Sequence, residues 1–331
     1  MANPVTLFTG QWGDFALADL LPKVAGWGYD GLELACKGDH FDFVRAAQDP
    51  DYCAAHRELL AKHGLGVWAI SNHRCGQLVC DPNDFRTDVF VPERFRGKPA
   101  AKRDYGIDHM QLTAQAAKNL GVSVVTGFTG SPIWSYLYRF PAVDESVMDA
   151  AFAEFAELWN PILDVFGECG VRFALDVHPA QIAYDFHTTA RALDAVGRRP
   201  EFGINFDPSH LFWQMLDPVL FVREFADRIY HMHVKDCALT LDGRSSILGS
   251  RLNFGDARRG WDFRSAGHGQ VPFGDLFGAL NASGYTGPLS VEWEDSRMDR
   301  EWGAADALRY VRRTAFPAAK LSLDQALGNK K

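Results

Sequence analysis

The sequence has 331 residues, 47% of them apolar, and a formal net charge of −8 at pH 7. The apolar fraction is sufficient for a large buried core, and one α/β barrel routinely exceeds 250 residues. The acidic balance offers no basic field for nucleic acid, and the sequence has neither a signal-peptide pattern nor an apolar run of about 18 residues. We therefore expect a cytoplasmic protein without nucleic-acid or membrane partners.

Short apolar runs recur along the chain with the β-branched content of buried parallel strands. The predicted strands are 5–9, 31–35, 66–71, 122–128, 171–177, 203–206, 229–234 and 289–293. Amphipathic segments, several of which stop at a glycine, predict helices at 14–26, 51–63, 108–120, 145–169, 188–196 and 273–283. Pro161 is expected to split or kink the fourth of these helices.

Eight strand–helix units without a break in composition predict the α/β class and a closed (β/α)8 TIM barrel. We expect one domain over residues 1–316 and a polar tail over residues 317–331. A doubly wound sheet is the alternative, but no GxGxxG motif follows the first strand. The long connections at 75–106, 129–145 and 236–271 follow strands, so they are expected on the C-terminal face, where such barrels build their sites.

Four polar clusters stand at the ends of the last four predicted strands. They are Asp176-Val-His178, Asp207-Pro-Ser-His210, His231-Met-His233-Val-Lys235-Asp236 and Glu292-Trp-Glu294. Alternating side chains of a strand share one face, so each cluster can present its acids and histidines to the barrel mouth. Clustered carboxylates repel one another unless a cation is present. Individually, Asp207 also suits a helix cap and His231 a core imidazole.

The segments Phe206-Asp207-Pro-Ser-His210, His231-Met-His233-Val-Lys235-Asp236 and Ser290-Val-Glu292 resemble those of the sugar phosphate isomerase/epimerase superfamily. These xylose-isomerase-like TIM barrels include tagatose 3-epimerases, inosose dehydratases and endonuclease IV. The resemblance runs from Gly31-Leu-Glu33 to Glu292, which is nearly the whole chain. It implies one divalent metal, Mn²⁺ before Co²⁺, Zn²⁺ or Mg²⁺. The implied metal ligands are Asp176, Asp207, His233 and Glu292, and the resemblance places Glu33 and His210 beside the substrate.

One departure from the family pattern concerns the catalytic base. The family usually has Glu where this chain has Asp176, and the shorter side chain reaches about one C–C bond less far. His178 is on the same face of the strand, so the base opposite Glu292 is either Asp176 or His178. Lys235 and Asp236 are expected to orient His233 or to bind a substrate hydroxyl.

The endonuclease IV branch binds three metal ions and has a D-x-H motif after strand seven. This chain has Asp262-Phe-Arg264 there, and arginine cannot ligate a metal. A one-metal site is therefore preferred, with Arg264 binding a substrate oxygen. Trp134, in the second long connection, is a further candidate for sugar binding.

Together these features predict a metal-dependent isomerase or epimerase of a ketose or oxo-sugar, phosphorylated or not. The predicted route is a metal-bound enediolate, with Glu292 and either Asp176 or His178 as the acid/base pair. The alternatives are a lyase or dehydratase of an oxo-sugar or oxo-glycoside, an endonuclease IV-type hydrolase and a non-catalytic sugar-binding barrel. The expected partners are a small carbohydrate and further copies of the chain, as a dimer or tetramer.

Overall fold

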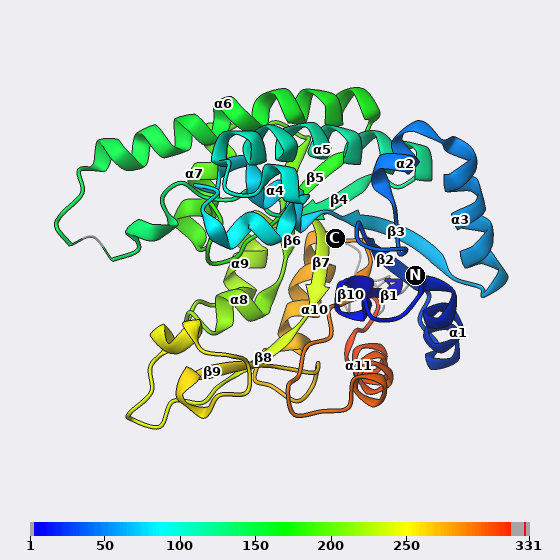
Figure 1. Ribbon diagram of the computed structural model, residues 1–331. Helices are drawn as coiled ribbons and strands as arrows, with labels where there is room; N and C mark the ends of the chain where they lie inside the picture. The colour runs from blue at the N-terminus through cyan, green and yellow to red at the C-terminus, as the bar shows by residue number, and fades with distance from the viewer. Residues whose placement is uncertain (1–2, 139, 319–327, 329–331) are drawn as a thin grey trace.

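Eight parallel strands form a closed barrel in the computed structural model, which describes residues 3–138, 140–318 and 328 (Figure 1). Around the barrel the order is β1-β10-β7-β6-β5-β4-β3-β2. The strands are β1 (Val5–Phe8), β2 (Gly31–Ala35), β3 (Gly66–Ser71), β4 (Val124–Gly127), β5 (Arg172–Asp176), β6 (Phe202–Phe206), β7 (Ile229–Val234) and β10 (Leu289–Val291). The predicted TIM barrel is confirmed.

Barrel closure joins the two ends of the sequence. Leu7 of β1 pairs with Val291 of β10 on one side and with Leu32 of β2 on the other. All three side chains are buried, as expected of parallel strands that are covered on both faces. Because every strand of the barrel is parallel to its neighbours, all strand C-termini meet at one mouth.

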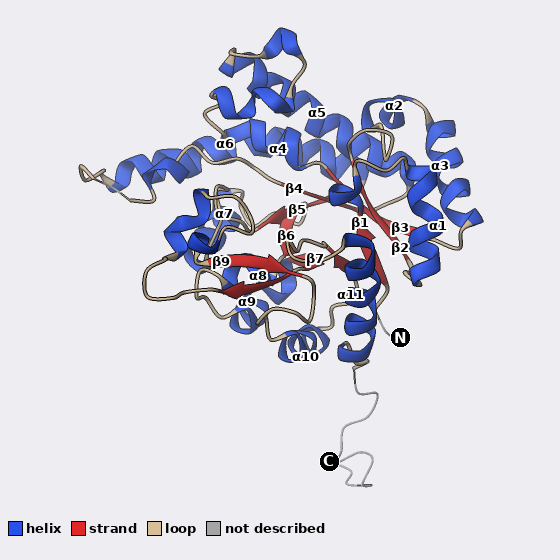
Figure 2. Cartoon of the chain, turned by 60° about the horizontal axis from the view of Figure 1, so that its bottom comes forward, coloured by secondary structure: helices blue, strands red, loops and turns tan. Residues whose placement is uncertain are grey.

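The helices lie outside the strands (Figure 2). They are α1 (Leu17–Trp27), α2 (Phe43–Gln48), α3 (Pro50–Lys62), α4 (His73–Cys80), α5 (Pro99–Leu120), α6 (Glu145–Cys169), α7 (Phe186–Ala195), α8 (Pro208–Phe212), α9 (Pro218–Phe225), α10 (Phe273–Ser283) and α11 (Arg300–Thr314). Helix α1 ends at Gly28, whose φ of 99° is a left-handed conformation that favours glycine.

Helix α6 differs from the sequence-based expectation because it continues through Pro161 as one helix. Trp159, Ile162 and Leu163 on either side of the proline are fully buried. The packing of this face against the barrel therefore keeps the helix continuous despite the missing backbone donor. In the described part of the chain, no helix is long and apolar enough to cross a membrane.

Two of the long connections contain α-helices or strands. Residues 75–106 include most of α4 and the start of α5, while residues 236–271 form an antiparallel hairpin of β8 (Asp236–Leu239) and β9 (Trp261–Arg264). This hairpin projects from the mouth below β7 in the view of Figure 1. Of the predicted tail, only residues 317, 318 and 328 lie within the described part of the chain.

Candidate metal and substrate site

Four potential metal ligands converge at the barrel mouth. Asp176 ends β5, Asp207 follows β6, His233 lies in β7 and Glu292 follows β10. Each offers one ligand atom, and these atoms all lie within 4.8 Å of one another. All four residues are buried. The structure thus brings together the four residues that the sequence analysis selected as one ligand set.

Asp207 both caps a helix and faces this cluster. Its Oδ1 accepts hydrogen bonds from the backbone N–H of Ser209 at 2.9 Å and from the Ser209 hydroxyl at 2.7 Å, at the start of α8. Its Oδ2 lies 2.9 Å from Lys235 Nζ. Burial raises the pKa of Asp207 to about 6, although the Lys235 charge opposes the shift.

Lys235 and His233 balance the negative charge of the cluster. Lys235 Nζ also lies 2.9 Å from Glu292 Oε2, and His233 Nδ1 lies 2.8 Å from the same oxygen. Burial opposes ionisation of Glu292, but the charges of Lys235 and His233 outweigh it and hold the Glu292 pKa well below its usual range. The cluster therefore requires positive charge, here supplied by an ammonium and an imidazole.

These residues fit a divalent ion. Three carboxylates and one imidazole are donors that Mn²⁺, Co²⁺ and Zn²⁺ accept. The Oδ1 atom of Asp176 is buried and has no hydrogen-bond partner among the described residues. A bound cation would satisfy this oxygen, and it would compete with the Lys235 ammonium for Asp207 and Glu292.

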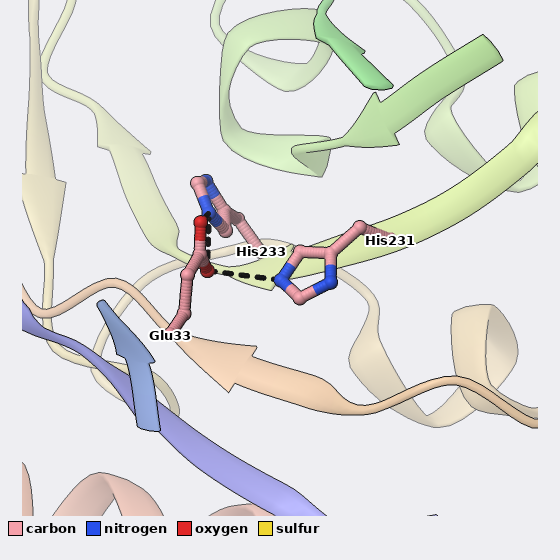
Figure 3. A group of neighbouring side chains, drawn as sticks. All are labelled: Glu33, His231 and His233. Atoms are coloured by element: carbon pink, nitrogen blue, oxygen red, sulfur yellow. Dashed lines mark hydrogen bonds and ion pairs between the residues drawn. The ribbon is translucent and has the colours of Figure 1, made fainter. Parts of the chain in front are cut away.

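Glu33 is completely buried. Its carboxylate faces the imidazoles of His231 and His233 (Figure 3). Its carboxylate accepts hydrogen bonds from His231 Nε2 at 2.9 Å and from His233 Nε2 at 3.0 Å. The hydroxyls of Ser290 and Thr126 donate to it as well, at 2.7 and 2.5 Å. The family resemblance predicts Glu33 beside the substrate. It lies deeper because residue 33 is in the middle of β2 instead of at its end.

A cavity of about 320 Å³ opens beside the four potential ligands. Of the predicted site residues it is lined by Asp176, His178, His210, Lys235 and Glu292. Glu294, from the last of the four polar clusters, lines it as well, and its wall also contains residues outside the predicted clusters, among them Phe8, Gln11, Lys37, Asn72 and His73. The cavity is therefore lined by residues at the ends of earlier strands as well as by those at the ends of the last four strands.

His73 and Gln11 have the most direct contacts with the cluster among these additional residues. His73 Nε2 lies 3.6 Å from Asp176 Oδ2. Gln11 Nε2 donates to Glu292 at 2.9 Å and to Glu294 at 3.1 Å, and burial raises the pKa of Glu294 to about 7. Asn72 and His73 directly follow the strand 66–71, so the polar strand-end signal was present for them. Gln11 follows β1 within an ordinary turn sequence and gave no such signal.

The imidazoles of His178 and His210 contact each other in the cavity wall, with ring centroids 3.9 Å apart and ring planes tilted by 59°. Burial lowers the pKa of both rings, and the neighbouring positive charges lower that of His210 further. His178 Nδ1 donates to the carbonyl of Pro179, which can only accept. His178 is therefore a neutral imidazole with its lone pair on Nε2.

The three remaining predicted residues lie elsewhere, and none of them lines this cavity. Asp236 and Arg264 pair across the β8–β9 hairpin. The Asp236 carboxylate accepts backbone N–H groups within the connection, and the Arg264 guanidinium contacts Asp262 at 3.3 Å and the Phe263 carbonyl at 2.6 Å. Trp134 lines a second cavity that adjoins the first.

A closed parallel barrel with carboxylates and histidines at its C-terminal mouth defines a TIM barrel with a candidate metal centre. The chain belongs to the xylose isomerase-like TIM barrel family, whose model matches residues 21–314.

Among curated proteins, the uncharacterized protein YfiH of Bacillus subtilis is 27% identical over 92% of this chain and 97% of its own length. The inosose dehydratase of Clostridium tetani is 29% identical over 33% of this chain and 37% of its own length.

Two solved structures share the fold at low identity. The IolI protein with a bound zinc atom has a TM-score of 0.66 at 16% identity, covering 96% of this chain and 100% of its own. The Escherichia coli 3-keto-D-glucoside 4-epimerase YcjR has a TM-score of 0.66 at 14% identity, covering 94% of this chain and 99% of its own. These likenesses show the fold, and the family that they represent contains isomerases, epimerases and dehydratases.

Proposed function

We propose that the protein is a divalent-metal-dependent isomerase or epimerase of a ketose or oxo-sugar. The observation that carries this proposal is the convergence of Asp176, Asp207, His233 and Glu292 within 4.8 Å beside a cavity at the barrel mouth. The epimerase YcjR and the zinc-bound IolI protein, which share this fold, support it. A bound ion would polarise the substrate carbonyl and acidify the neighbouring C–H group.

Proton transfer in this proposal belongs to Glu292 and His178. Both line the cavity, and the His178 Nε2 lone pair is free to accept a proton because Nδ1 is used at Pro179. Asp176 is assigned to metal binding because its carboxylate lies among the other ligands, with Oδ2 3.7 Å from His233 Nδ1. One base removes the proton next to the carbonyl. Delivery of a proton to the opposite face by the other base gives an epimer, and delivery of a proton to the neighbouring carbon gives an aldose or ketose.

Glu33 and His231 are proposed as positioning residues for His233. A carboxylate can only accept, so the hydrogen bond to Glu33 fixes the proton of His233 on Nε2 and turns Nδ1 toward the other ligands. Such carboxylate–histidine–metal arrangements orient the ligand and increase its basicity. The proposed role of binding substrate hydroxyls falls to three other residues, which are Lys235, His210 and Gln11. The cytoplasmic location, the carbohydrate partner and the oligomeric state stay predictions.

A lyase or dehydratase is the second candidate, favoured by the similarity to inosose dehydratases. The same α-proton would be removed, and a group β to the carbonyl would then leave. The two candidates differ in product. An isomerase or epimerase returns every atom of the substrate, whereas a dehydratase releases one water per turnover.

The test combines metal analysis with deuterium uptake. The purified protein is stripped with a chelator, reloaded with Mn²⁺, Co²⁺, Zn²⁺ or Mg²⁺, and incubated in D2O with a panel of ketoses and oxo-sugars. We expect one ion per chain and metal-dependent deuterium at the carbon beside the carbonyl. Glu292→Gln should slow exchange by about 10²–10⁴-fold, while Glu58→Gln on the exposed face of α3 serves as the matched control. Full exchange by the stripped protein would overturn the proposal.

A further inference from the structure

A second cavity of about 310 Å³ adjoins the cavity at the metal site. We call the first the inner chamber and the second the outer chamber. They share the lining residues His73, Arg74, Phe128 and His178. The rest of the outer chamber comes mainly from the connections that follow β3, β4 and β5, and includes Gln77, Phe90, Ser131, Trp134 and Gln181.

Aromatic rings from three separate segments face the outer chamber. They are Phe90, at the end of a turn of 3-10 helix, Phe128, just after β4, and Trp134. Trp134 is fixed in place because its backbone N–H donates to Ser131 Oγ at 3.1 Å and its ring packs edge-on against Tyr184, with centroids 5.3 Å apart. The chamber thus has preformed flat apolar walls of the kind that bind a planar ring.

The polar groups of the outer chamber are mostly used within the protein. Gln181 Oε1 accepts the backbone N–H groups of Thr129 and Gly130, and Gln181 Nε2 donates to Gln77 at 2.6 Å. Arg86 is paired with Asp84 at 2.8 Å. These groups are not free to recognise the many hydroxyls of a second sugar or the oxygens of a phosphate. The lining therefore favours a ligand with a flat apolar surface.

Arg74 stands at the boundary between the chambers and lines both. Its guanidinium lies over the ring of Phe90, with Cζ 5.7 Å from the ring centroid. The Arg74 side chain is exposed, and no carboxylate among the described residues forms an ion pair with it. Because a long side chain without an ion pair can shift at little cost, a ligand can extend past Arg74 from one chamber into the other.

We propose that the substrate is an aryl glycoside of an oxo-sugar, with its sugar ring in the inner chamber and its aromatic aglycone in the outer chamber. This inference rests on the proposed function and narrows its substrate from any ketose or oxo-sugar to this class. Each chamber is at the lower end of the roughly 300–1,000 Å³ usual for ligand sites, so each suits one ring and the two together suit a two-ring ligand. Trp134 and Phe90 become the residues that determine specificity for the aglycone.

The kinetic test compares three substrates on the Mn²⁺-loaded protein: 3-oxo-glucose, methyl 3-oxo-β-glucoside and phenyl 3-oxo-β-glucoside. Burying a phenyl ring in the outer chamber should lower KM for the phenyl glycoside about 10–100-fold relative to the methyl glycoside. Trp134→Ala should remove this preference and leave KM for 3-oxo-glucose unchanged. Tyr136→Ala is the matched control, because Tyr136 is an exposed aromatic residue of the same turn that lines neither chamber.

A binding test separates this proposal from the proposed function. Phenyl β-glucoside has no oxo group and cannot react, so calorimetry reports its affinity alone; we expect it to bind about 10–100-fold more tightly than methyl β-glucoside. If this preference holds but no oxo-sugar exchanges deuterium, the proposed function fails and the outer chamber stands. If 3-oxo-glucose exchanges but phenyl and methyl glycosides have equal KM and Kd, the outer chamber proposal is overturned. Phe90→Ala repeats the test if Trp134→Ala does not fold, as judged by its thermal melt.

Discussion

Replacing Glu33 by Gln tests whether this buried carboxylate controls the metal ligand above it. The substitution keeps the size of the side chain but changes what it presents to His231 and His233, which contact it at 2.9 and 3.0 Å. An amide has one accepting oxygen and an NH2 group that cannot accept. Both imidazoles contact Oε2, and His233 Nε2 also contacts Oε1 at 3.2 Å. With the amide oxygen at the Oε2 position, the NH2 group replaces Oε1, so His233 loses one of its two accepting oxygens. Both imidazoles also lose the negative charge of their acceptor, which weakens the restraint that holds His233 Nδ1 toward Glu292.

The expected magnitude follows from this contact. Loss of the partner that orients a ligating histidine typically weakens metal binding by about 10–100-fold. Metal that binds only the folded state stabilises it according to its affinity, so this loss removes about 1.4–2.7 kcal/mol of metal-induced stabilisation at a metal concentration well above Kd. The fold itself should also be weakened, by about 1–3 kcal/mol for each buried donor left unpaired.

The assay measures Mn²⁺ affinity by competition with a chromophoric chelator, and the free energy of unfolding in urea with and without Mn²⁺. The difference between the two unfolding energies isolates the metal effect from the general destabilisation. Thr126→Val is the matched control, because it removes one donor to Glu33, at 2.5 Å, without touching either imidazole. If Glu33→Gln binds Mn²⁺ within two-fold of the wild type, the positioning role assigned to Glu33 is wrong.

The remaining predictions concern single side chains. His178→Ala should abolish deuterium exchange while retaining the metal, and exchange at the wild-type rate would transfer the base role to Asp176. Asp236→Ala should destabilise the β8–β9 connection, because four backbone N–H groups lose their acceptor; faster proteolysis within residues 240–260 is the readout. Arg264→Ala should lower the melting temperature and leave KM unchanged, and a raised KM would restore its role in substrate binding. The Arg300 hydrogen bond lowers the pKa of Asp14 from 3.8 to about 2, so this pair stabilises the fold above pH 3.8 and ceases to do so as the pH falls through 2. Because the pair is largely exposed, Asp14→Asn should cost less than about 1 kcal/mol at pH 7, measured by urea unfolding, and nothing near pH 2.

The barrel strands were predictable because parallel strands covered on both faces are almost continuously apolar. The predicted runs 31–35, 66–71 and 229–234 coincide with β2, β3 and β7. Helix α11 was missed because much of its buried face consists of Gly303, Ala304 and Ala307, which gives little hydrophobic periodicity. The extension of α5 back to Pro99 was missed because its first turns lack a regular apolar stripe.

The candidate ligands could be selected from the sequence because they stand at the ends of successive strands, and parallel strand ends must meet at one mouth. The depth at which a side chain lies within the barrel could not be predicted from its place at a strand end. Glu33 belongs to a layer below the mouth, a position set by the stagger of β2 against its neighbours. Asp236 and Arg264 face each other because of hairpin register, which no local pattern in the sequence specifies.

The hydrogen bonds of Glu33 have a consequence for folding. Its partners His231 and Ser290 lie 198 and 257 residues further along the chain. Contacts between such distant residues form late, because a long loop must be closed before they are made. The network that orients His233 can therefore exist only after β10 has joined β1 and the last gap between strands has closed. Acquisition of tight metal binding during refolding should accordingly mark the final closure of the barrel.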